Sequence, residues 1–245
     1  MTGPVLVTES TDRMFVLLNR PDARNAIDLA MVEALHEVCR QLEAEPKVAL
    51  IRGAGGTFAA GADIAQLRER RRDDALRGIN SGILDRIRRL PMPVIGLIDG
   101  YALGGGAELA YACDFRIGTS TTKIGNPEPG LGILAAAGAG WRLKELVGEP
   151  LAKEILLAGR ILDADAALTC HLLNEVAEDL EAAGHRLADR IVSQAPLAVR
   201  LTKSLFHAPR DAHPLIDEIA QAVLFETGEK HERMTAFLDR KKVKS

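Results

Sequence analysis

Apolar and polar side chains alternate over the first twenty residues of the chain. Val5 and Val7, then Phe15 and Leu17, stand on either side of the polar residues 10–12. This spacing is typical of a strand, a turn and a second strand. The sequence therefore predicts that the fold opens with a β-hairpin.

The next segments alternate between helical and strand patterns. Asp28 stands where the N-cap of a helix belongs, and short apolar strands are expected at 48–51 and 94–98. Each of these strands runs into a glycine-rich turn, at 53–56 and at 104–106. Strands alternating with helices in this way indicate an α/β fold. The helix after Asp28 is predicted from apolar residues at helical spacing, namely Val32, Leu35, Val38 and Leu42.

The pattern changes after about residue 140. From there to the end it is mostly helical, interrupted by glycine and proline, and only 174–177 still has the pattern of a strand. No long linker separates the two parts. We therefore expect a βα core that carries a helical extension.

Composition and charge exclude several classes of protein. With 47% hydrophobic and 27% charged residues in 245, the chain is not of the disordered type, and a net charge of −3 does not favour nucleic-acid binding. Its three separated cysteines argue against a disulfide framework or a structural zinc. We find no leader pattern and no stretch of membrane-spanning length, so a cytoplasmic location without membrane contact is expected.

Two glycine-rich segments, 58–64 and 100–109, hold the first candidate chemistry. Both follow predicted strands, and a helix beginning near Gly105 would point its first amide hydrogens at whatever lies in front of them. Two facing loops of this kind can each give one amide to a single oxyanion. Glu108, three residues after Gly105, would lie on the same helix face as that amide.

A second carboxylate stands in a rigid loop further along the chain. Glu128 lies between Pro127 and Pro129. Two carboxylates held in place are what paired general acid and base chemistry requires. We therefore consider Glu108 and Glu128 the candidate catalytic residues.

Other motifs have simpler explanations. The segment 130–135 fits a GxGxxA fingerprint, but prolines occupy the place of the strand that should precede it. The basic run 68–72 is interleaved with acids and is typical of a solvated helix face, with phosphate contact as the minority interpretation. None of the six histidines has the spacing of a zinc hydrolase or a serine esterase site.

Four blocks of sequence carry a family resemblance. In order along the chain they are 19–26, 60–64, 104–110 with 113–114, and 127–128. Together they resemble the enoyl-CoA hydratase/isomerase (crotonase) family. The resemblance continues through 158–161 and 225–241, so it covers essentially the whole chain.

The resemblance implies a spiral of ββα units in residues 1–190, followed by a helical region, 191–245, that serves trimerisation and covers the active site. It also implies a homo-oligomer, either a trimer or a dimer of trimers. The ligand it implies is a coenzyme A thioester, and no metal, separate cofactor or nucleic-acid partner is expected. The residues expected at coenzyme A are Ala23, Arg24, Ala60, Ala62, Asp63 and Ile64.

By the same resemblance, the amides of Ala62 and Gly105 form the oxyanion hole for the thioester carbonyl. A water between the two carboxylates adds to the β carbon of a trans-2-enoyl-CoA, giving 3-hydroxyacyl-CoA. Glu108 helps to activate that water, and Glu128 is associated with the proton delivered to the α carbon. The sequence therefore favours an enoyl-CoA hydratase, a hydro-lyase.

Departures from the hydratase pattern keep an alternative open. Ala135 and Ala136 replace the usual Pro-Gly of a turn that helps to seat the water, and Trp141 replaces a small polar pair. Pro129 removes one backbone donor beside Glu128. An enoyl-CoA double-bond isomerase, which needs one base and no seated water, is the alternative, while an RNA-binding relative is disfavoured by the charge. Acyl chain length is not predicted.

Overall fold

The computed structural model describes residues 3–242, and their backbone confirms the opening hairpin. The strands of the hairpin pair antiparallel at one edge of a six-stranded sheet in the order β1-β2-β3-β4-β6-β9, whose other strands run parallel. Its central strands are apolar on both faces, as expected of a parallel sheet covered on both sides. The strands of this sheet are β1 (Val5–Glu9), β2 (Arg13–Leu18), β3 (Val48–Gly53), β4 (Val94–Ile98), β6 (Phe115–Gly118) and β9 (Glu175–Val176).

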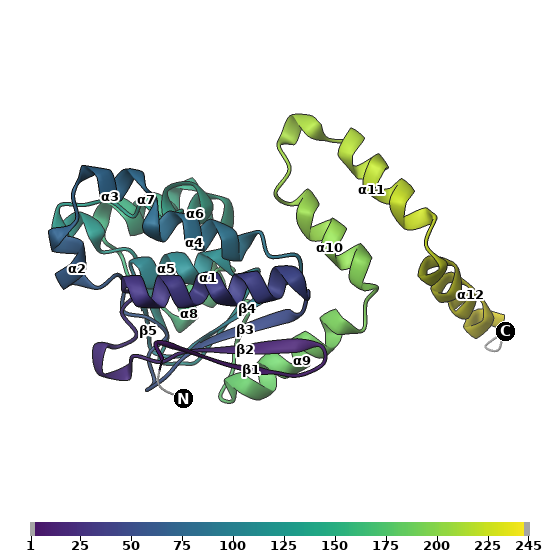
Figure 1. Ribbon diagram of the computed structural model, residues 1–245, viewed down its shortest axis with the longest axis horizontal. Coiled ribbons are helices and arrows are strands. Elements are labelled where there is room, and N and C mark those ends of the chain that lie inside the picture. Colours follow the sequence, from purple (N-terminus) through teal and green to yellow (C-terminus); the bar gives the residue numbers. More distant parts are fainter. Residues whose placement is uncertain (1–2, 243–245) are drawn as a thin grey trace.

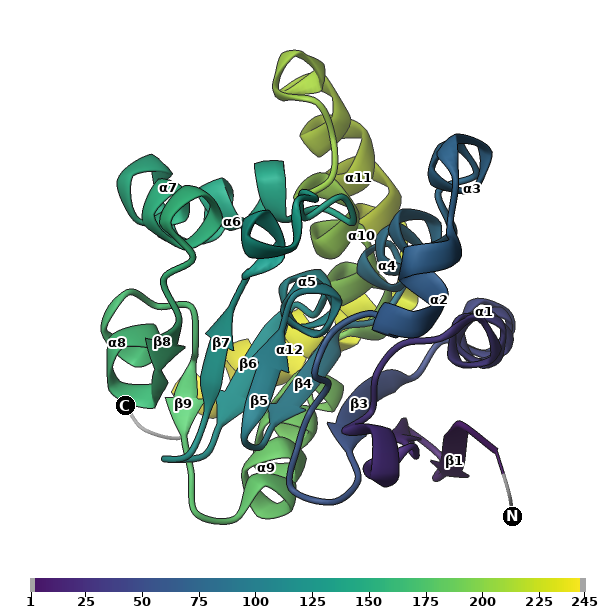
Figure 2. The same cartoon turned by 90° about the vertical axis from the view of Figure 1, so that its left-hand side faces the viewer.

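A second, three-stranded sheet has the order β5-β7-β8. The chain passes repeatedly from the large sheet to the small one, from β4 to β5 and, after helix α5, from β6 to β7 (Figure 2). This is the predicted ββα arrangement. The elements of this part are β5 (Tyr101–Leu103), α5 (Gly105–Ala112), β7 (Lys123–Gly125) and β8 (Leu162–Asp163); the two-residue strand β8 was not predicted.

Helices cover both faces of the large sheet. Helix α1 (Leu29–Ala44) begins where expected, because the Asp28 side chain accepts a hydrogen bond of 2.8 Å from the amide of Met31. The α1 residues at helical spacing are buried, and α1 packs against α4, which packs against α5. Helix α9 (Leu180–Val192) lies on the opposite face, against β3, β4 and β6 (Figure 2). The core therefore has an apolar layer on each side of the sheet.

Short helices and turns link these layers. They are η1 (Pro21–Ala23), α2 (Ile64–Glu69), α3 (Arg72–Leu76), α4 (Ile79–Arg88), η2 (Glu128–Leu131), α6 (Ala139–Val147), α7 (Glu149–Ala158) and α8 (Ala164–Thr169).

The end of the chain is helical and projects from the body of the molecule (Figure 1). The expected boundary after residue 190 falls inside α9, two residues before that helix ends. Lys203 anchors the extension, since its Nζ donates to the carbonyl of Met92 at 3.0 Å and to Asp114 at 2.6 Å. The helices are α10 (Pro196–Leu205), η3 (Arg210–Ala212), α11 (Leu215–Phe225) and α12 (Gly228–Lys242); residues 243–245 lie outside the described part.

These observations confirm the predicted α/β class with a helical C-terminal region. Within residues 3–242 no helix is long and apolar enough to cross a bilayer.

Candidate active site

Strand pairing brings the predicted loops together. Strands β5 and β7 are parallel, with Leu103 opposite Gly125, so the chain leaves both strands at the same end of the small sheet. A parallel bridge between Ala59 and Ala102 aligns the segment 59–62 with the same strand end. Three segments far apart in the sequence therefore meet beside the start of α5.

The approach of α5 to the segment 59–62 depends on glycine. A Cβ at Gly106 would lie 2.0 Å from the carbonyl oxygen of Ala59, which no side chain permits. The two segments are also close at the next residue of α5, since a Cβ at Gly105 would lie 3.4 Å from the nitrogen of Ala62. Gly105 is the first residue of α5, so its N–H has no acceptor within the helix.

The amide of Ala62 also points away from its neighbouring strand. In the bridge between Ile27 and Ala62, the residues that bond to Ile27 are Gly61, through its carbonyl, and Asp63, through its N–H. In an extended chain the N–H of the residue between them faces the other way. Ala62 and Gly105 both line the same cavity, and the predicted use of their N–H groups as an oxyanion hole stays a prediction.

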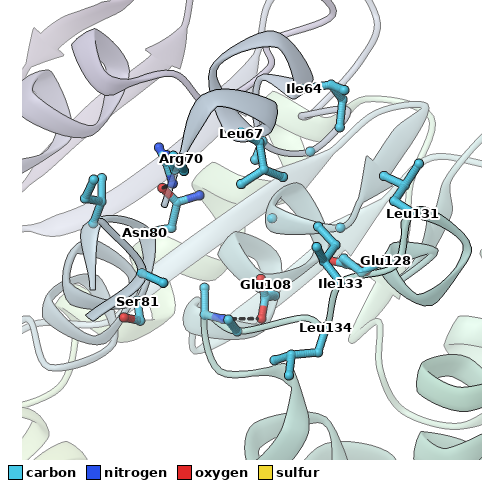
Figure 3. A pocket seen from close by; sticks show the side chains of 18 of the residues that line it. Ile64, Leu67, Arg70, Asn80, Ser81, Glu108, Glu128, Leu131, Ile133 and Leu134 are labelled. Carbon is cyan, nitrogen blue, oxygen red and sulfur yellow. Dashed lines mark hydrogen bonds between the residues drawn. The ribbon is translucent and has the colours of Figure 1, made fainter. Parts of the chain in front are cut away.

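That cavity has a volume of about 650 Å³ and is mostly apolar. Figure 3 shows Glu108 and Glu128 within it, with Leu131, Ile133 and Leu134 on one side and Arg70 and Ser81 on the other. All its lining residues lie between 60 and 137. The helical region after residue 190 does not contribute to it, and its predicted role in covering the site stays a prediction.

Glu108 is the more firmly held carboxylate. It lies on α5, is 4% exposed, and its Oε1 accepts hydrogen bonds from the amides of Ala137 at 2.7 Å and Ala139 at 3.1 Å. Burial raises the pKa of Glu108 to about 7; the amides of Ala139 and Ala137 oppose the rise, and the charge of Glu128 adds to it. A carboxyl group with such a pKa can act as a base near neutral pH.

Glu128 stands at the first position of the short helix η2 and is 8% exposed. Its Oε1 lies 3.3 Å from the Nδ2 of Asn126, whereas Oε2 is buried with no hydrogen-bond partner among residues 3–242. Burial raises the pKa of Glu128, and the Asn126 contact opposes this. Pro129 removes no hydrogen bond here, because a residue in the first turn of η2 needs no N–H donor within the helix.

The unusual turn at 135–136 leads directly into the residues that hydrogen-bond to Glu108. The residues just after it, Ala137 and Ala139, supply the two amides that bind Glu108. A backbone N–H donates equally well from alanine as from glycine. Replacing the Pro-Gly of the family pattern therefore leaves Glu108 well supported.

The residues expected at coenzyme A divide into two groups. Ala60, Ala62 and Ile64 line the cavity. Ala23, Arg24 and Asp63 do not line it: Arg24 is exposed, and the Asp63 carboxylate caps α2 and pairs with Arg20 at 3.3 Å. The first group is in position to contact a ligand in the cavity, whereas contact of the second group with coenzyme A stays a prediction. The carbonyl of Arg24 accepts a hydrogen bond of 3.0 Å from the amide of Ala60, beside the cavity.

Three residues of the basic run, Arg70, Arg71 and Arg72, line the cavity where α2 ends and α3 begins. Two acid–base pairs of the run lie in solvent, as a solvated face would: Arg68 with Glu69 at 2.8 Å and Arg72 with Asp73 at 3.3 Å. Phosphate contact by these arginines stays a prediction. The break between the two helices brings them to the cavity, and charge spacing alone does not reveal it.

A second chamber of about 180 Å³ lies beside the cavity and shares Ser81, Glu108, Ala136 and Ala137 with it. Trp141 and Arg88 line its other side, with the Arg88 guanidinium 4.8 Å from the centre of the indole ring. Trp141, one of the departures from the family pattern, therefore borders the chamber beside Glu108.

No group of three or more metal-ligating side chains occurs in the part of the chain that the structure describes.

Comparison with known proteins identifies the family. The sequence model of the enoyl-CoA hydratase/isomerase family matches residues 13–244. The chain is 35% identical to the short-chain-enoyl-CoA hydratase of Clostridium acetobutylicum, covering 93% of this chain and 92% of that one. It is 36% identical to the crotonyl-CoA hydratase of Syntrophomonas wolfei, with 97% and 96% covered.

The fold of the chain is also similar to that of a solved enoyl-CoA hydratase. The enoyl-CoA hydratase of Bacillus anthracis superimposes with a TM-score of 0.90 at 30% identity, covering 97% of this chain and 96% of that one. The spiral fold expected from the sequence is confirmed by this match, and the named relatives support an enzyme of the hydro-lyase class. The chain belongs to the enoyl-CoA hydratase/isomerase family.

Proposed function

We propose that the protein hydrates a trans-2-enoyl-CoA to the 3-hydroxyacyl-CoA. The observation that carries this proposal is the presence of two buried carboxylates, Glu108 and Glu128, in one cavity beside the amides of Ala62 and Gly105. Hydration needs a base for the water and an acid for the α carbon, and this site has a candidate for each.

In the proposed mechanism Glu108 accepts a proton from water as the oxygen adds to the β carbon. Its Oε1 is occupied by two amide donors, so Oε2 is the atom that faces the water. Glu128 delivers a proton to the α carbon. The intermediate charge on the thioester oxygen is stabilised by the N–H groups of Ala62 and Gly105, with Gly105 at a helix N-terminus.

The rest of the cavity supports a coenzyme A thioester as ligand. The mostly apolar lining suits the pantetheine chain, and Arg70, Arg71 and Arg72 offer positive charge to phosphates. We infer a short acyl group, because the second chamber next to Glu108 is small and ends at Trp141 and Arg88. The two relatives named for short-chain and crotonyl substrates agree with this inference.

Double-bond isomerisation is the second candidate. It requires one base that moves a proton between carbons, and Glu108 with its pKa of about 7 would suffice. The presence of a second buried carboxyl group, Glu128, favours hydration over it.

The test follows the absorbance of the conjugated 2-enoyl thioester. It falls when crotonyl-CoA or a long-chain 2-enoyl-CoA is hydrated, and it rises when a 3-enoyl-CoA, added separately, is isomerised. Turnover of crotonyl-CoA, abolished in Glu108→Gln and Glu128→Gln variants that still bind coenzyme A, supports hydration. Turnover of the 3-enoyl thioester alone supports the isomerase, and full hydration by both variants refutes the assigned roles.

We also propose that the protein forms a homo-oligomer, a trimer or a dimer of trimers, through its C-terminal helices. Helices α11 and α12 expose apolar side chains that a monomer leaves in water. Exposed fractions above one half are found for Leu215, Ile219, Phe225, Met234, Phe237 and Leu238. Light scattering of the purified protein measures the mass directly.

A further inference from the structure

A histidine of the C-terminal extension holds an arginine that borders the second chamber. Arg88 is the last residue of α4, and its side chain lines that chamber while being only 11% exposed. His207 follows α10 and contacts Arg88 twice, with Nδ1 2.6 Å from Nη1 and Nε2 3.1 Å from the carbonyl oxygen. His207 does not itself line the chamber, so it reaches the chamber through Arg88.

The two contacts define the protonation state of His207. A guanidinium only donates hydrogen bonds, so Nδ1 must be the acceptor and carries no proton. A backbone carbonyl only accepts, so Nε2 carries the proton and donates to Arg88. That carbonyl belongs to the last turn of α4, where a helix has no N–H of its own to offer. The imidazole is therefore neutral, in the Nε2–H form.

The charged groups that face His207 come from three places: Arg88 on α4, Lys203 on α10 and Asp114 just before β6. Burial lowers the pKa of His207, and the charges of Arg88 and Lys203 lower it further, whereas Asp114 and the Arg88 carbonyl oppose the change. A second proton on the imidazole, at Nδ1, would point an N–H at the guanidinium and break the contact. Only the neutral histidine can hold Arg88 in this way.

Three groups surround the Arg88 guanidinium. Asp85, one turn earlier on α4, accepts from Nε at 3.2 Å and from Nη2 at 2.8 Å. His207 takes Nη1, and the ring of Trp141, on α6, lies 4.8 Å from Cζ. Asp85 is 44% exposed and also pairs with Arg89 at 2.7 Å, so its hold on Arg88 is that of a surface ion pair. His207 fixes the guanidinium from a second element.

We propose that His207 is a positioning residue that holds the Arg88 guanidinium against Trp141 and thereby limits the length of acyl group that the second chamber accepts. This inference rests on the proposed function, since the chamber receives an acyl group only if the ligand is an acyl-CoA. Arg88 and Trp141 both line the chamber, and a guanidinium released by His207 is free to leave the indole ring. The chamber then has room for a longer chain.

The first experiment measures acyl preference as the ratio of kcat/KM for a six-carbon 2-enoyl-CoA to that for crotonyl-CoA. His207→Ala should raise this ratio about three- to tenfold at about pH 8. His207→Asn, whose amide oxygen can accept from Arg88, should keep the ratio within about twofold of the wild type. The control is His36→Ala, which removes the same kind of contact, from Nδ1 to Nη1 of Arg86 at 3.1 Å, outside both cavities.

The pH dependence of this ratio distinguishes positioning from a merely structural role. Protonation of Glu108 lowers kcat/KM for both substrates alike, so it cancels in the ratio. The wild-type ratio should rise below the ordinary histidine pKa of 6.5, where a proton on His207 releases Arg88, and the ratio in His207→Asn should not change. In an Arg88→Met background, His207→Ala should leave the ratio unchanged.

A second readout needs neither turnover nor substrate. Trp141 is the only tryptophan in the chain, so its fluorescence reports the contact with Arg88. Below pH 6.5 the emission of the wild type and of His36→Ala should change more than that of His207→Asn. Glu108 titrates in all three proteins, so the difference belongs to His207.

The outcomes are distinct. An unchanged ratio in His207→Ala, or equal pH dependence of the ratio in the wild type and His207→Asn, would overturn the role of His207 in acyl preference. If His207→Ala does not fold, the comparison of the wild type with His207→Asn decides. If the emission responds as expected but no enoyl-CoA is hydrated, the hold on Arg88 stands and the proposed function is wrong.

Discussion

Glu108 and Ala137 are joined by a hydrogen bond of 2.7 Å, from a backbone amide to Oε1 of the carboxylate, across 29 positions of sequence. Together with the Ala139 amide it holds a buried carboxyl group in one orientation. The turn that departs most from the hydratase pattern is therefore part of the support for the candidate base.

The pH dependence of kcat/KM should reflect Glu108. Burial raises its pKa to about 7, and the base has to be unprotonated to accept a proton from water. We expect kcat/KM for crotonyl-CoA to fall about tenfold per pH unit below that value. Initial rates between pH 5 and 9 measure it, and a flat profile down to about pH 5 would show that Glu108 is not the base.

The same carboxyl group should affect stability with pH. The ordinary pKa of this carboxyl group is 4.5, and burial in the folded protein raises it to about 7. Ionisation of Glu108 therefore opposes folding. The stability present below pH 4.5 is lost as the pH rises toward 7, by about 3 kcal/mol. The Glu108→Gln variant should keep its stability as the pH rises through this range. Urea unfolding at acid and mildly alkaline pH measures it, and equal pH dependence of variant and wild type would contradict the burial of an ionisable Glu108.

Trp141 should limit the acyl chain. Trp141→Ala enlarges the second chamber, so activity on a six- or eight-carbon enoyl-CoA should rise relative to crotonyl-CoA. Leu157→Ala, at a position 73% exposed and outside both cavities, is the control. An unchanged ratio of kcat/KM values in Trp141→Ala would place the acyl tail elsewhere.

The arginines that line the cavity should bind coenzyme A through its phosphates. Replacing Arg71 and Arg72 together by Ala should weaken coenzyme A binding by about three- to tenfold at low salt, and less at high salt, since exposed charges are screened. Calorimetric titration of free coenzyme A measures this, with Arg89→Ala, outside the cavity, as control. Equal affinity at both salt concentrations would assign the phosphates to another surface.

Lys203 should matter for stability rather than catalysis. Its side chain is 7% exposed and joins α10 to Asp114, which accepts in turn from the amide of Val94 at 2.7 Å. Lys203→Met leaves a mostly buried carboxylate unpaired, and we expect a loss of about 2–3 kcal/mol in the free energy of unfolding. Lys153→Met, in an exposed pair with Glu149, should cost under about 0.5 kcal/mol. A negligible change at Lys203 would mean that α10 is held by its apolar contacts.

The sequence by itself determined the features that depend on neighbouring residues. The hairpin, the helix capped by Asp28 and the place of Glu108 one turn after Gly105 follow from local spacing, because strand and helix periods are local properties. Glu108 and Glu128 were candidate catalytic residues from the sequence pattern, and the family resemblance gave each of them a role in hydration.

Only the tertiary structure decided which groups surround those carboxylates. The pairing of β5 with β7 brings Asn126 to Gly104, and the fold places Ala137 and Ala139 on Glu108 across 29 and 31 positions of sequence. Such contacts join segments with no common period, so no pattern along the chain encodes them.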